Sequence, residues 1–182
     1  MPRQGSCYAG KGGTQTKAQC DASCKPGPPG PPAPNPPCTA PGCEPFPIPG
    51  DGAVAYKNGC ASNCSLLIML HGAGGDGEKM AVDSTMHDKL TGAIIAYPTS
   101  VPLGGWPILT TGPNWAANLA VIQRLIDMPE VDKSRVFVLG FSSGGFYAYA
   151  LACAIGDQLA VTVVNSALKC VCRAVLVVVG LL

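Results

Sequence analysis

The chain has 182 residues, of which 47% are hydrophobic and 13% charged, and its formal net charge is +1. This is enough for one ordinary domain with a substantial core and a tail, and the scattered Lys and Arg residues argue against a nucleic-acid groove, which needs a clustered basic face. No apolar run reaches the eighteen or more residues of a membrane span, so we expect neither a nucleic-acid nor a membrane partner.

Cysteine is concentrated near the start of the chain. Seven of the ten cysteines precede the first strong strand, namely Cys7, Cys20, Cys24, Cys38, Cys43, Cys60 and Cys64. Such density beside Pro and Gly is typical of disulfide-bonded proteins from an oxidising compartment, so we predict disulfides and a secreted protein, although residues 1–4 show no apolar signal-peptide core. Zinc is the alternative use of cysteine, but no His and no CxxC pair precedes Ser65, and we therefore expect no metal and no cofactor.

Composition divides the chain into three parts. Residues 1–25 form a short cysteine-containing segment, which is too small to build its own core. Residues 26–50 read as a stiff linker, because twelve of the residues from Pro26 to Gly50 are proline and proline lacks the amide donor that helices and central strands need. We expect this N-terminal part to be disordered and residues 51–182 to form the domain.

Within the domain, strands and helices alternate. Buried strands are predicted at 65–70, 93–97, 136–139, 161–164 and 175–179, because these are short continuous apolar runs. Helices are predicted at 78–90, 118–128 and 146–153, where apolar residues recur at helical spacing or fill the whole segment. This order predicts an α/β fold with a mostly parallel sheet.

One motif joins a predicted strand to a predicted helix. Gly140-Phe141-Ser142-Ser143-Gly144 matches G-x-S-x-G, in which the serine projects from a sharp turn and the flanking glycines lack the Cβ atoms that would clash. We predict that Ser142 is a catalytic nucleophile. The alternative is a plain Gly-Ser turn, and the strand–motif–helix order favours the nucleophile.

A glycine-rich loop, His71-Gly72-Ala73-Gly74-Gly75, directly follows the first buried strand. A loop at this place donates one backbone amide to the oxyanion hole of such hydrolases, and the residue after the nucleophile donates the other. The predicted donors are the N–H groups of Ala73 and Ser143, supported by His71, Gly72, Gly140 and Gly144, with His71 in a structural role. A phosphate-binding loop is the alternative, but no Lys-Ser or Lys-Thr pair follows the glycines.

Four segments together resemble one family of secreted esterases, the feruloyl esterase, acetylxylan esterase and polyhydroxybutyrate depolymerase family: Leu70–Gly77, Ala96–Pro98, Val131–Val138 and Gly140–Gly145. The similarity runs from about Ser65 to Ala167. It implies a three-layer α/β-hydrolase fold and a serine esterase acting on plant cell-wall esters or polyesters, with Ser142 as nucleophile. Asp132 and Arg135 match a loop of the family and are expected to be structural.

The rest of the catalytic triad is not visible in the sequence. In this fold the acid and then the histidine follow the serine, whereas only Asp157 and no His follow Ser142. We expect Asp157 to lie at a helix end and His87 in a helix that covers the sheet. Because the resemblance places the acid just after the strand at 175–179, we expect a C-terminally truncated domain with impaired activity.

Two other functions stay open. A catalytically inactive, hydrolase-like binding module is supported by the missing base. A serine peptidase of the prolyl-oligopeptidase type shares the same elbow, but such enzymes usually carry a propeller domain, so ester substrates are favoured. Trp106 and Trp115 are candidates for a sugar or aromatic acyl pocket, or for ordinary packing.

Overall fold

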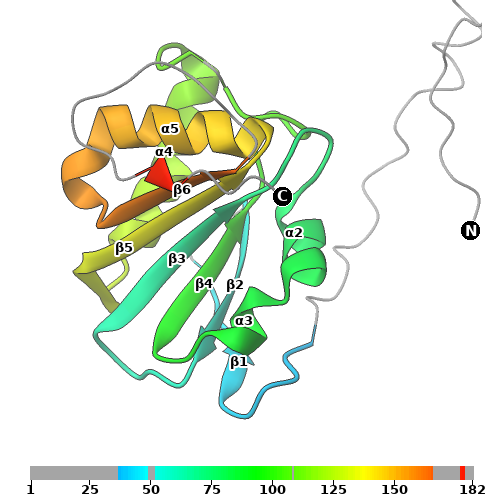
Figure 1. Cartoon of the computed structure of the whole chain (residues 1–182), viewed down its shortest axis with the longest axis vertical. Helices are drawn as coiled ribbons and strands as arrows, with labels where there is room; N and C mark the ends of the chain where they lie inside the picture. The colour runs from blue at the N-terminus through cyan, green and yellow to red at the C-terminus, as the bar shows by residue number, and fades with distance from the viewer. Residues whose placement is uncertain (1–36, 49–51, 108, 166–176, 179–182) are drawn as a thin grey trace, which may run out of the picture. The chain divides into compact units, whose positions relative to one another are not determined.

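The computed structural model describes residues 37–48, 52–107, 109–165 and 177–178 (Figure 1). The predicted segment 1–25, most of the predicted linker and three residues of the last predicted strand therefore lie outside the described residues. The described elements are β1 (Cys43–Pro45), β2 (Ala53–Asn58), β3 (Cys64–Leu70), α2 (Gly77–Ser84), α3 (Met86–Lys89), β4 (Ala93–Pro98), α4 (Pro113–Ile126), β5 (Val131–Phe141), α5 (Ser143–Ile155), the 3₁₀ turn η1 (Gly156–Gln158), β6 (Val161–Asn165) and β7 (Val177–Val178).

The strands form one seven-stranded sheet in the order β1-β2-β4-β3-β5-β6-β7. All pairs from β4 to β7 are parallel, and β1 and β2 add two antiparallel pairs at one edge. The prediction of an α/β fold with a mostly parallel sheet is confirmed. Because parallel strands all end at the same edge, the loops that follow β3, β4 and β5 are brought together there.

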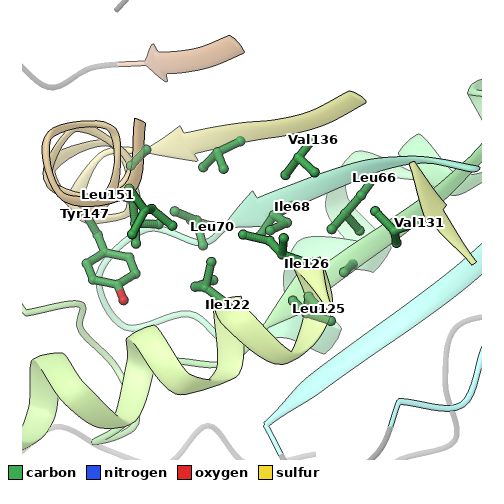
Figure 2. Packing of buried hydrophobic residues seen from close by; sticks show 14 of the residues in the cluster. Leu66, Ile68, Leu70, Ile122, Leu125, Ile126, Val131, Val136, Tyr147 and Leu151 are labelled. Atoms are coloured by element: carbon green, nitrogen blue, oxygen red, sulfur yellow. The ribbon is translucent and has the colours of Figure 1, made fainter. Parts of the chain in front are cut away.

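Helices cover both faces of this sheet, with α4 and α5 on one side and α2 and α3 on the other (Figure 1). The alternation of side chains along β3 explains the two cores: Leu66, Ile68 and Leu70 pack with α4 and α5, as Figure 2 shows, whereas Met69 belongs to the opposite cluster. Strand β3 is therefore apolar without interruption from Leu66 to Leu70, which is the pattern that predicted it.

The predicted helix 78–90 is interrupted. Asp76 caps its start, since the carboxylate accepts a hydrogen bond from the Lys79 N–H at 2.7 Å. Thr85 then adopts a left-handed conformation with φ 47°, which ends α2 and starts α3. A β-branched residue rarely adopts this conformation, so the break depends on tertiary contacts, above all on the Tyr97 hydroxyl, which accepts a hydrogen bond from the His87 N–H at 3.1 Å.

Two further elements differ from the sequence-based expectation. The antiparallel strands β1 and β2 were not predicted, and β1 lies inside the range predicted as linker. Strand β1 occupies the edge of the sheet. Pro45 has no N–H to donate, and at an edge this does not interrupt the hydrogen bonds of a central strand. Helix α4 begins at Pro113, five residues before the predicted start, because proline is tolerated in the first turn of a helix. The domain boundaries predicted from composition, between residues 25 and 26 and between residues 50 and 51, remain predictions.

Two disulfides join pairs of described residues, Cys38–Cys43 and Cys60–Cys64, as the cysteine pattern predicts. The sulfur atoms of Cys38 and Cys43 lie near a carboxylate oxygen of Asp88, all within 4.8 Å of one another. Metal binding by cysteine needs the thiolate, which a disulfide does not offer, so this cluster does not support the zinc alternative. No helix among the described residues is both long and apolar enough to cross a membrane.

Candidate active site

Ser142 lies on the turn between β5 and α5, with φ 52° and ψ −116°. A residue other than glycine costs of order 1–3 kcal/mol in such a conformation and keeps it only where the surroundings hold it. Here the Ser142 N–H donates to the Asn165 carbonyl at the end of β6 (2.9 Å), and the Ser142 carbonyl accepts from the N–H of Gly145 at 2.9 Å. The serine is thus on a strained strand-to-helix turn, the local geometry expected for the motif.

The flanking glycines allow the chain to double back at this turn. A Cβ atom on Gly140 would collide with the backbone of Gly144 and lie 2.7 Å from the Gly145 nitrogen. A Cβ atom on Gly144 would collide with the Leu70 carbonyl and lie 2.6 Å from the His71 carbonyl oxygen. Real Cβ atoms do not approach other atoms this closely, so only glycine lets the start of α5 pack against the end of β3.

The loop at 71–75 lies directly beside the turn. A Cβ atom on Gly72 would be 3.6 Å from the Ser142 Cβ and 3.1 Å from the Phe141 ring. Ala73 is exposed on this loop, and Ser143 is the first residue of α5, where an N–H has no acceptor within the helix. The structure therefore brings the loop and Ser142 together, which the sequence predicted only from the order of its motifs.

His71 is buried, and both of its ring nitrogens form hydrogen bonds. Its Nδ1–H donates to the Gly72 carbonyl at 2.8 Å, and its Nε2 accepts the Ser100 N–H at 3.1 Å. A carbonyl can only accept and an amide can only donate, so the two partners determine a neutral Nδ1–H tautomer. Burial lowers the pKa of this imidazole. A proton from Ser142 could not be accepted at Nε2 without breaking the bond to Ser100, and the expected structural role fits this geometry.

His87 lies in the other core, on the face covered by α2 and α3. Its ring stacks on Tyr56 with centroids 4.0 Å apart, and its Nδ1 is 3.0 Å from the Tyr97 hydroxyl. The side chain is buried, and burial lowers its pKa. His87 thus packs between α3 and the sheet, as expected for a helix that covers the sheet.

Because His87 is buried in its neutral form, the free energy of unfolding is expected to fall as the pH drops from about 6.5 toward 5. The unfolded histidine titrates near 6.5 and the folded one below it, so the unfolded state binds more protons in this window and stability rises with pH. His71 adds a contribution of the same sign.

Urea midpoints at pH 5, 6 and 7.5 measure how steeply the stability rises with pH. The variant His87→Phe keeps the stacking but cannot titrate, so its stability should rise less steeply with pH. Asp88 and Asp132, with pKa lowered to about 2, titrate below this window. If the stability of both proteins rose equally steeply with pH, this would contradict the conclusion that folding buries His87 in its neutral form.

Asp132 and Asp157 lie at the far ends of the two elements that meet at Ser142, namely β5 and α5. Asp132 accepts hydrogen bonds from the Ser134 hydroxyl at 2.7 Å, from the Ser134 N–H at 2.9 Å and from Arg135 Nε at 2.7 Å, and these bonds lower its pKa to about 2. Arg135 also donates to the Asn63 carbonyl, so the pair ties β5 to the turn before β3, as the structural interpretation expects. Asp157 lies in η1, directly after α5, which is the helix end predicted for it.

A pocket of about 200 Å³ adjoins the loop 71–75. One wall is the loop itself, and the others come from Met80 and Lys79 of α2 and from Phe141, whose side chain is 47% exposed. Asp83 forms an ion pair with Lys79 at the rim (2.7 Å). The pocket therefore combines apolar walls with a charged edge, close to the turn that carries Ser142.

The two tryptophans are packing residues. Trp106 and Trp115 are 6% and 7% exposed, and their rings lie against Tyr147, with centroid distances of 4.9 and 5.3 Å. The structure thus favours the packing alternative over a sugar pocket. Trp106 has a second role that the sequence does not reveal, since its Nε1–H donates to the His71 carbonyl at 2.8 Å.

Solved structures with a similar fold place this architecture among known proteins. An acetyl xylan esterase from Aspergillus awamori is 24% identical, with 67% of this chain and 50% of that chain covered and a TM-score of 0.51. A fluorophosphonate-binding serine hydrolase from Staphylococcus aureus, with substrate bound, is 16% identical, with 68% and 55% covered and a TM-score of 0.50. The chain spans about half the length of these two structures. No protein-family model and no curated protein matches it. The likeness confirms the predicted α/β-hydrolase fold class.

Proposed function

We propose that this protein is a serine carboxylic-ester hydrolase that acts on plant cell-wall esters or polyesters, with Ser142 as its nucleophile. The observation that carries the proposal is the strained turn at Ser142, with the loop 71–75 packed against it. A serine held in this way is exposed to substrate on one side and to backbone amide donors on the other. The names of the two similar structures, an esterase and a serine hydrolase, support the same reaction class.

In the proposed reaction Ser142 loses its proton to water, since His71 and His87 are engaged elsewhere, and its oxygen attacks the ester carbonyl carbon. The carbonyl oxygen becomes an oxyanion, which accepts hydrogen bonds from the N–H groups of Ala73 and Ser143; removing one such donor typically costs about 10²–10³ in rate. The C–O bond to the alcohol then breaks as the alcohol takes up the proton, leaving an acyl-enzyme. Water attacks this acyl group next, which releases the acid and restores the serine.

The pocket beside the loop is proposed to receive part of the ester. Its apolar walls at Met80 and Phe141 suit an acyl chain or ring, and the charged pair at its rim suits a hydroxyl-bearing polymer. The two disulfides support a secreted protein that meets such substrates outside the cell. We propose no nucleic-acid and no membrane partner, and no metal or cofactor in the reaction.

A fluorophosphonate probe tests the proposal. We expect it to modify Ser142 about 10³ times faster than an exposed serine such as Ser62, because the oxyanion donors and binding alone retain catalysis of roughly 10³–10⁴ over water. Peptide mass spectrometry of the labelled protein locates the adduct, and Ser142→Ala is the control that should lose it. Equal modification of all serines would contradict an oxyanion-stabilised nucleophile.

A second candidate function, a hydrolase-like module that binds without catalysis, is favoured by the state of the two histidines. His71 uses both ring nitrogens in hydrogen bonds, and His87 is stacked in the opposite core. Neither can serve as the base in this arrangement. Selective labelling of Ser142 supports the esterase, whereas its absence together with retained binding of a cell-wall polymer would support the binding module.

A further inference from the structure

Resting on the proposed function, we infer that Asn118 of α4 is a positioning residue for the oxyanion hole. The hydrogen bonds of its side chain go to Val101 and Asn114, and not to Ser142 or the loop 71–75. Asn118 acts through the segment 99–106, which follows β4 and lies between α4 and that loop. Three steps, each made of hydrogen bonds, connect the Asn118 side chain to the amide of Ala73.

In the first step Asn118 holds the backbone of Val101 from both sides. Its Oδ1 accepts the Val101 N–H at 3.0 Å, and its Nδ2 donates to the Val101 carbonyl at 2.6 Å. The second proton of Nδ2 goes to the Asn114 carbonyl in the preceding turn of α4 at 2.8 Å. The amide group thus uses both donors and its acceptor, and the side chain is 1% exposed. A fully satisfied buried amide of this kind determines one position for the segment that it binds.

In the second step the segment closes on itself next to Val101. The Ser100 hydroxyl accepts the Gly105 N–H at 3.0 Å and donates to the Pro102 carbonyl at 3.2 Å. These bonds make a compact turn of residues 100–105, so holding Val101 holds the whole turn.

In the third step the segment 99–106, which includes the turn, binds the oxyanion loop at three places. The Ser100 N–H donates to His71 Nε2 at 3.1 Å, Trp106 Nε1–H donates to the His71 carbonyl at 2.8 Å, and the Gly74 N–H donates to the Gly104 carbonyl at 2.8 Å. These contacts lie on both sides of Ala73 in the chain. The position of the Ala73 amide relative to Ser142 therefore depends on the turn, and the turn depends on Asn118.

Geometry at this point has a large effect on rate, because displacing a catalytic group by about 1 Å can cost on the order of 10²-fold. The sequence alone does not mark Asn118, since an asparagine in a helix reads as a surface residue or a cap. Its burial and its two bonds to one distant residue appear only in the fold.

Hydrogen exchange of single amides tests this inference without relying on activity. In Asn118→Ala we expect the Gly74 N–H to exchange about tenfold faster or more, because the variant loses both hydrogen bonds to Val101, and the loss of each weakens a local structure by a factor of roughly five. Amides of the central strand β5 should keep their rates. We also expect the fluorophosphonate to label Ser142 about tenfold more slowly, which is a smaller effect than the about 10²–10³ expected for loss of a whole donor.

Asn58→Ala is the matched control. Asn58 is a second buried asparagine, and its Nδ2 donates to the His87 carbonyl at 2.8 Å, in the opposite core. It has no connection to the segment 99–106 among the contacts of the described residues. We expect this variant to lose stability, while the exchange of Gly74 and the labelling of Ser142 stay within about twofold of the original protein.

An unchanged exchange rate of the Gly74 amide in folded Asn118→Ala overturns the inference. An equal acceleration of this exchange in Asn58→Ala also overturns it. If Asn118→Ala does not fold, Trp106→Phe carries the test, since it keeps an aromatic ring in the core and removes the donor of the bond to the His71 carbonyl. That variant should also accelerate Gly74, and no acceleration would overturn the inference. Failure of the original protein to label at Ser142 would count against the proposed esterase alone, because the exchange result does not depend on it.

Discussion

Residues 1–182 are expected to hydrolyse a simple ester with a kcat on the order of 10⁶ below that of an ordinary serine esterase. Loss of the general base alone has this effect in a comparable hydrolase. No histidine follows Ser142, and both histidines of the chain, His71 and His87, are engaged elsewhere. With a typical kcat of about 10 s⁻¹, the expected value is on the order of 10⁻⁵ s⁻¹.

Hydrolysis of p-nitrophenyl acetate, followed for many hours against Ser142→Ala, measures this residual rate. The pH profile distinguishes the mechanism. Without a base, the serine-dependent rate should rise about tenfold for each pH unit between 6 and 8, because it follows the deprotonated serine, whereas a histidine base gives a plateau above its pKa. A kcat within tenfold of ordinary esterases, or a plateau near pH 7, would show that a base acts on Ser142.

Gly144→Ala is expected to lower the free energy of unfolding by about 3 kcal/mol or more. The added Cβ would collide with the carbonyl groups of Leu70 and His71, which are backbone atoms at the end of a central strand and cannot move aside. Overpacking usually costs about 1–3 kcal/mol. A collision with backbone atoms is expected to cost an amount at the upper end of this range. Since whole domains are stable by only about 5–15 kcal/mol, much of the stability is lost.

Gly156→Ala is the matched control for this substitution. Gly156 has φ −61°, which any residue adopts, and an added Cβ would meet nothing within 4 Å. Replacing a glycine with alanine at such a position stabilises a protein by about 0.4–1 kcal/mol, chiefly through the unfolded state. Urea unfolding of both variants gives the comparison. A loss at Gly144 as small as the change at Gly156 would mean that α5 and β3 are not packed as closely as the structure has them.

Much of the fold could be predicted because its signals are local. The strands near 65–70, 93–97 and 136–139 are apolar without interruption, and burial on both faces of a parallel sheet requires this. The motif around Ser142 is also local, since a strained turn needs glycines within two residues of the serine. The same holds for Ala73 and Ser143, whose places follow from their motifs. Their catalytic roles stay predictions.

Other features could not be predicted because they depend on distant partners. The left-handed Thr85 breaks a helix whose sequence pattern continues without interruption. The break is held by the Tyr97 hydroxyl of β4, which accepts a hydrogen bond from the His87 N–H. Strand β2 contains few strong signals of its own and is added by pairing with β4, from Ala53↔Pro98 to Asn58↔Ala93. In both cases the deciding contact joins residues that no local pattern connects.

The order of the elements, the sharp turn at Ser142 and the glycine-rich loop after β3 can be read from the sequence, because each follows from side-chain size and polarity within a few neighbouring residues. Three features appear only in the folded chain: the loop lies against Ser142, both histidines are occupied, and Asn118 reaches the loop through Val101. The physical reason is that buried polar groups must find hydrogen-bond partners, and in a folded sheet those partners come from segments far apart in the chain.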